Sequence, residues 1–139
     1  MAPAPIEAKY EGIGICDGYR NDKWVVCIKN WKPNNDINGL EHLEIHHTTD
    51  EQFILLSGKC VLITAERKDD RFQMRLTRLE VGTLYTVPAE CWFFTIVQRN
   101  TKMMYVQDSS CSTENSEYCK LTQQEIAFIQ KYAGPMLAE

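Results

Sequence analysis

Residues 44–58, EIHHTTDEQFILLSG, constrain the fold of this chain most, because they read as two short strands joined by a polar turn. The first strand ends in the adjacent histidines His46 and His47, and the second opens with Glu51. The dipeptide Ser57-Gly58 then turns the chain toward a third strand. Two neighbouring strands can therefore present an imidazole and a carboxylate to one space. Such a pair suits a transition-metal site, and it equally suits general acid–base catalysis.

Short β-forming segments of similar length lie on both sides of this stretch. They cover residues 24–29, 40–47, 52–56, 59–65, 72–77, 84–87, 92–98 and 102–107. Polar or turn-forming residues separate them, among them the loop at 31–39, the charged tract at 66–71 and Pro88. Successive strands at this spacing favour an antiparallel sandwich or barrel, so the sequence predicts an all-β fold.

The two ends of the chain differ from this β-rich middle. Residues 1–12 contain two prolines and a glycine, and we expect them to form an N-terminal arm. The barrel should occupy residues 13–110. Residues 111–139 should form a polar loop and a C-terminal α-helix.

The C-terminal helix has clear start and stop signals. Thr122 and Glu125 form a capping box at its beginning. Gly134 and Pro135 predict that it ends at about Ala133. Its apolar stripe predicts packing on the outside of the barrel, a structural role without chemistry of its own.

The central stretch resembles the first conserved motif of the cupins, G-x5-H-x-H-x3,4-E-x6-G. Gly39, His47, Glu51 and Gly58 match it, and Ile45 stands at the first histidine position. The resemblance implies a cupin-type double-stranded β-helix, a jelly-roll barrel.

Residues 82–96 resemble the second cupin motif, G-x5-P-x-G-x2-H-x3-N. Gly82 and Pro88 match it, whereas Glu90 stands at the glycine position and Phe93 at the third metal-binding histidine. A cupin metal centre resembles three imidazoles and one carboxylate around the ion. This register keeps only His47 and Glu51, so it implies a lost or degenerate metal site. A weakly bound divalent metal, held by His47 and Glu51, is the one cofactor that it leaves open.

A second register of the same strand is also open. It places several polar side chains on one strand face, namely His42, Glu44 and His46, together with Glu51. We expect the first register instead, because the second turns Leu43 and Ile45 away from the barrel interior.

Aromatic side chains supply candidate walls for a ligand pocket beside His47 and Glu51. They are Phe53, Trp92, Phe93 and Tyr105, with Tyr85 as an alternative to Tyr105. Three functions follow from this pocket. The chain is a cupin that binds a small organic ligand such as a sugar or carboxylic acid, an enzyme, or a structural or regulatory barrel. The enzyme would use a metal or the His47–Glu51 pair to transfer protons as an isomerase, epimerase or lyase. Whether it is an enzyme stays open, because one fold hosts many chemistries.

The composition of the chain argues against some classes of binding partner. The net charge of −4 and the absence of a basic patch argue against nucleic acid. No stretch approaches the ~18 apolar residues that a membrane span needs. The first residues lack the features of a secretory signal, which predicts a cytoplasmic protein. The edge-strand dimers seen in many cupins, together with the expected N-terminal arm, predict a homodimer.

The six cysteines are scattered without a metal-binding spacing. In a cytoplasmic protein, they are expected to be reduced structural thiols. Cys91, which follows Pro88 closely, is the one candidate for a catalytic thiol.

Overall fold

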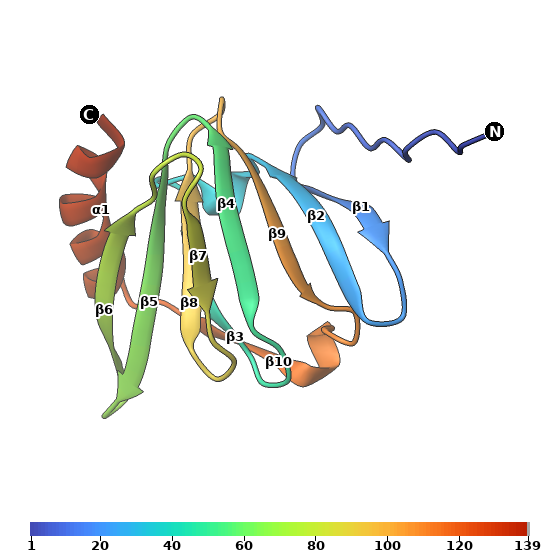
Figure 1. Ribbon diagram of the computed structural model, residues 1–139. Helices are drawn as coiled ribbons and strands as arrows, with labels where there is room; N and C mark the ends of the chain where they lie inside the picture. Colours follow the sequence, from blue (N-terminus) through green and yellow to red (C-terminus); the bar gives the residue numbers. More distant parts are fainter. Residues whose placement is uncertain (139) are drawn as a thin grey trace.

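The computed structural model describes residues 1–138, which form two five-stranded antiparallel sheets and a C-terminal helix (Figure 1). In hydrogen-bonded order, the first sheet contains β1 (Ile15–Arg20), β2 (Trp24–Asn30), β9 (Lys102–Asp108), β4 (Glu51–Ser57) and β7 (Leu84–Val87). The second contains β10 (Ser116–Lys120), β3 (His42–His46), β8 (Trp92–Val97), β5 (Cys60–Lys68) and β6 (Arg71–Arg78). The prediction of an all-β jelly roll with a C-terminal helix is confirmed.

Short 3-10 helices interrupt two of the connections. They are η1 (Pro33–Asn35), between β2 and β3, and η2 (Thr113–Asn115), before β10. The N-terminal residues lead away from β1 as an exposed segment (Figure 1). The side-chain amide of Asn30 donates to the Tyr10 carbonyl at 2.9 Å, which fastens the end of that segment to the barrel.

The main core lies between the two sheets. Its fully buried side chains alternate along their strands, and they include Val25, Phe53, Phe93 and Met103. Each comes from a position whose neighbours in sequence point to the opposite face of the sheet. This alternation also fixes which polar side chains enter the barrel.

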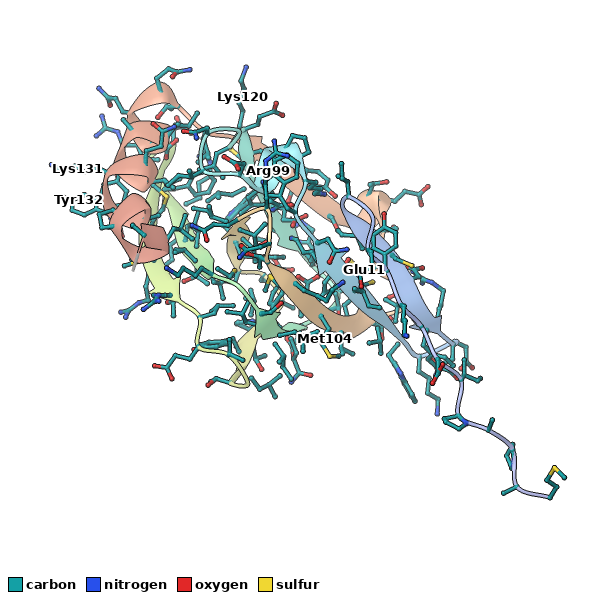
Figure 2. The ribbon with its side chains drawn as sticks, turned by 90° about the horizontal axis from the view of Figure 1, so that it is seen from above. Glu11, Arg99, Met104, Lys120, Lys131 and Tyr132 are labelled. Carbon is teal, nitrogen blue, oxygen red and sulfur yellow. The ribbon has the colours of Figure 1, made fainter. Side chains whose placement is uncertain are left out.

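A second core lies between the outer face of the second sheet and helix α1 (Gln123–Ala138). Leu43 of β3 and Ile63 of β5 are fully buried there with Ile129 of the helix. Figure 2 shows the opposite face of α1, where Lys131 and Tyr132 point away from the sheets. The central strands β3, β8 and β5 of the second sheet therefore have buried residues on both faces, and this decides the placement of the histidines.

Helix α1 begins as the sequence predicts but ends later. The Thr122 hydroxyl accepts from the Glu125 backbone at 3.1 Å, and the Glu125 carboxylate accepts from the Thr122 backbone at 2.9 Å. The expected end at Ala133 is wrong, because the helix continues through Pro135 to Ala138. Leu137 continues the buried stripe of Ile129 and Ala133, and its packing offsets the poor helix-forming tendency of the proline. Within the described chain, no helix is long and apolar enough to cross a membrane.

Candidate functional site

A polar cavity of about 360 Å³ opens between the two sheets. Strands β2, β3, β4 and β9 contribute its central side chains, which are Lys29, Glu44, His46, Glu51, Tyr105 and Gln107. All six lie on inward-facing positions of their strands, in phase with the buried core. The polar residues converge because β2, β9 and β4 of the first sheet and β3 of the second each place one or two of them at the same end of the barrel.

His46 is the buried histidine of this cavity, which His42 also lines. It is the last residue of β3, and only 9% of its surface is exposed. Its Nδ1 lies 2.7 Å from the Ser116 hydroxyl, which fixes the orientation of the ring. Its Nε2 lies 3.6 Å from a Glu51 carboxylate oxygen and 4.0 Å from one of Glu44. Burial lowers the pKa of His46, against the opposing effect of Glu44, and this favours a neutral imidazole.

Glu51 opens β4 and is 6% exposed. Burial, and then the nearby charge of Glu44, raise its pKa to about 8, while Lys29 opposes the shift. The carboxyl of Glu51 is therefore protonated at neutral pH. A protonated acid beside a neutral imidazole can donate a proton at one point of a ligand and accept one at another.

His47 does not enter the cavity, so the register that we expected is wrong. Its ring lies at the surface, with Nδ1 2.9 Å from a Glu90 carboxylate oxygen and Nε2 hydrogen-bonded to Glu117. Hydrogen bonds to Glu90 and Glu117 raise the pKa of His47. The structure therefore separates His47 from Glu51 and brings His46 to it instead.

The physical reason lies on the outer face of β3. Leu43 and Ile45 point away from the cavity in this register, yet both are buried. Leu43 packs in the core beneath α1. A polarity rule that expects apolar side chains only inside the barrel cannot choose the register of a strand with two buried faces.

The aromatic side chains that we expect to line the pocket lie in two different cores. Tyr105 lines the cavity, with its ring 5.8 Å from that of Phe53. Phe53 and Phe93 are buried in the main core, and the Phe93 ring lies 5.4 Å from the His46 ring. Trp92 is not part of the site. It points to the opposite face of β8 from Phe93 and packs against Phe72 at 5.4 Å.

Lys29 is a cavity residue that the sequence patterns described above do not predict. Only 6% of it is exposed, and its Nζ lies 2.6 Å from the Thr95 hydroxyl. Burial lowers its pKa, against the opposing charges of Glu44 and Glu51. The sequence does contain a sign of this position. Lys29 follows the buried Val25 and Cys27 at intervals of two residues, so all three lie on the same face of the strand.

Two further polar groups of the cavity lack partners. The side-chain carbonyl oxygens of Asn34 and Gln107 are buried and form no hydrogen bond within the described residues. Buried acceptors of this kind are costly unless a ligand or water satisfies them. They mark the cavity as a place for hydrogen-bond donors.

The cavity does not have the donor set of a cupin metal centre. Among residues 1–138, no three His, Cys, Asp or Glu side chains are grouped to hold a metal ion. Phe93 also places a phenyl ring beside His46, at the position where the cupin motif has an imidazole. The weakly bound metal at His47 and Glu51 has no geometric support, because the two side chains lie in different places.

The cysteines contribute little to the cavity. All six are free, and Cys27 and Cys60 are buried in the main core. Cys91 is half-buried, and burial raises its pKa, which disfavours a reactive thiolate. Cys111 lies at the cavity edge, with its sulfur 3.4 Å from His46 Nδ1.

No protein-family model matches the sequence, and no curated protein matches it. A variant of Streptomyces PAC13 with uridine superposes with a TM-score of 0.58 at 10% identity, covering 89% of this chain and 96% of that one. A further structure of Pac13, described as a nucleoside dehydratase, gives 0.57 at 9% identity, covering 89% and 95%. A cupin-2 domain protein from Shewanella frigidimarina gives 0.49 at 15% identity, covering 70% and 82%.

Identities this low make the likeness one of fold alone. The Pac13 barrel nevertheless matches almost the whole length of this chain. Together with the two-sheet topology, this likeness shows that the chain has a cupin-type jelly-roll barrel fold.

Proposed function

We propose that the protein binds a small, hydroxyl-bearing organic molecule in the cavity around His46 and Glu51. The unpartnered carbonyl oxygens of Asn34 and Gln107 carry this proposal, because both need a hydrogen-bond donor. The Glu44 carboxylate adds a third acceptor on the cavity wall. A sugar or nucleoside offers several hydroxyl donors to such a set of acceptors.

The size of the cavity supports a ligand of this class. Its volume of about 360 Å³ falls within the usual range of small-molecule sites, roughly 300–1,000 Å³. The Tyr105 ring provides an apolar surface beside the polar groups. Streptomyces PAC13, which shares the fold, is described with uridine, so a nucleoside is a reasonable first probe.

Proton-transfer catalysis is the second candidate function, and the His46–Glu51 pair favours it. The two side chains lie 3.6 Å apart in a buried site, and their shifted pKa values favour a neutral base beside a neutral acid. A pair of this kind suits a lyase, isomerase or epimerase. The activity described for Pac13, nucleoside dehydration, belongs to the lyase type.

We expect isothermal titration of the wild-type protein with uridine and with methyl glucoside to show binding of at least one of them. His46→Ala should abolish that binding, since it removes the imidazole from the cavity. His47→Ala is the matched control, because it removes a neighbouring surface imidazole and should leave the affinity unchanged. Equal losses in both variants would contradict the assignment of the cavity.

A further inference from the structure

The cavity contains Lys29, the one lysine that is buried among residues 1–138. Lys29 projects inward from β2 and lines the same cavity as His46 and Glu51. Among residues 1–138, the hydroxyl of Thr95 is the one hydrogen-bond partner of its amine, at 2.6 Å. An ammonium group carries three donors, so a buried ammonium here would leave two of them without a protein acceptor.

Lys102, unlike Lys29, has several acceptors around its amine. Its amine donates to the Tyr10 carbonyl and, at 2.9 Å, to the Asn30 side chain. It also lies 3.7 Å from the Glu11 carboxylate. These acceptors satisfy a charged ammonium, whereas the surroundings of Lys29 favour the neutral amine.

We propose that Lys29 is a nucleophile that forms a Schiff base with an aldehyde or ketone bound in the cavity. The inference rests on the proposed ligand site and names the chemical class of its substrate, a hydroxylated carbonyl compound. Three observations carry it: the burial of the amine, its single hydrogen-bond partner, and its place in a cavity that also contains a proton donor. Desolvated lysines are the usual source of such amines in proteins.

The step balances with groups that the cavity holds. The lone pair of Lys29 Nζ attacks the carbonyl carbon, a C–N bond forms, and the carbonyl oxygen takes a proton from the Glu51 carboxyl. The nitrogen now carries two protons and returns one of them to Glu51, which gives the neutral carbinolamine. The carbinolamine then loses its hydroxyl group and the remaining N–H proton as one water molecule, which leaves a C=N bond. The sum is amine plus carbonyl giving imine plus water.

The imine would serve the chemistry of the second candidate function. A protonated imine withdraws electrons from the adjacent carbon, and this makes its C–H bond more acidic than that of the parent carbonyl compound. His46, as a neutral imidazole in the same cavity, can accept that proton. Lys29, His46 and Glu51 would then act as nucleophile, base and acid.

A different reading makes Lys29 an ammonium that binds a carboxylate or phosphate. The Glu44 carboxylate lines the same cavity and would repel such an anion. The two readings differ in one measurable property, since only a neutral amine forms a covalent adduct with a carbonyl compound.

The test is trapping of the wild-type protein with glycolaldehyde and sodium cyanoborohydride at pH 7, followed by peptide mass spectrometry. We expect at least about tenfold more reduced adduct on Lys29 than on Lys102 or on the exposed Lys131 at short reaction times. Because the comparison lies within one wild-type sample, it does not depend on the folding of a variant.

Two variants show whether the adduct forms on Lys29 itself. Lys29→Met should remove this adduct and leave the slow labelling of surface lysines unchanged, whereas Lys102→Met should leave the Lys29 adduct intact. Labelling of Lys29 no faster than that of Lys131 would overturn the proposal. If uridine or methyl glucoside still bound in that case, the ligand site would stand and the Schiff base alone would be excluded.

Discussion

Phe93→Ala is expected to lower the free energy of unfolding by about 3–5 kcal/mol. Phe93 is 2% exposed in the main core, and its ring meets those of His46 at 5.4 Å and Phe53 at 5.9 Å. Alanine would leave a void between the sheets that the surrounding strands can only partly close. Urea unfolding followed by circular dichroism measures the loss.

Phe128→Ala provides the matched control for Phe93→Ala. Phe128 lies on helix α1 with 41% of its surface exposed, so the same truncation there should change stability by about 0.5 kcal/mol or less. A loss below about 1 kcal/mol for Phe93→Ala would show that Phe93 does not fill the space between the sheets.

Glu51→Gln is expected to make the protein more stable than the wild type at high pH, by a few kcal/mol. In the folded wild type, burial and Glu44 raise the pKa of Glu51 from its ordinary 4.5 to about 8. The folded state therefore binds a proton that the unfolded state has released. The stability that this bound proton contributes is fully present below about pH 4.5, and it is lost as the pH rises through about 8. Glutamine does not titrate, so its variant escapes this loss.

The measurement for Glu51→Gln is urea unfolding of variant and wild type at pH 5 and pH 9. The advantage of the variant should be small at pH 5 and large at pH 9. Glu7→Gln makes the same chemical change on an exposed residue of the N-terminal segment and controls for the lost charge. A stability difference that is the same at both pH values would mean that Glu51 ionises like an exposed carboxyl.

The fold could be predicted from the sequence because alternation along short strands is a local property. The segments at 24–29, 52–56 and 92–98 all correspond to strands, and the capping box of Thr122 and Glu125 marks the start of α1. The end of that helix was missed because burial of Leu137, a tertiary effect, outweighs the local signal of Pro135.

The candidate site was predicted only in part, for a physical reason. The sequence predicts Glu51 and Tyr105 as cavity residues, but it favours His47 where the structure places His46. The preference for His47 assumes that a strand has only one buried face. Strand β3 has two buried faces, because α1 covers the outer face of its sheet. Lys29 was overlooked because a lysine at the end of an apolar strand normally reaches solvent.

Other expectations stay predictions of the sequence. They are the division into arm, barrel and tail at residues 1–12, 13–110 and 111–139, the homodimer, and the cytoplasmic location. The homodimer and the cytoplasmic location depend on properties beyond the fold of a single chain.

The pKa values of the individual imidazoles test the central claim most directly, since they distinguish a buried His46 from a surface His47. Nitrogen-15 NMR titration of the three histidines, assigned with His46→Gln and His47→Gln, provides them. The structure predicts that the pKa of His46 lies below the ordinary value of 6.5 and that of His47 above it. The opposite order, with His47 shifted down and His46 shifted up, would contradict a cavity built around His46 and Glu51.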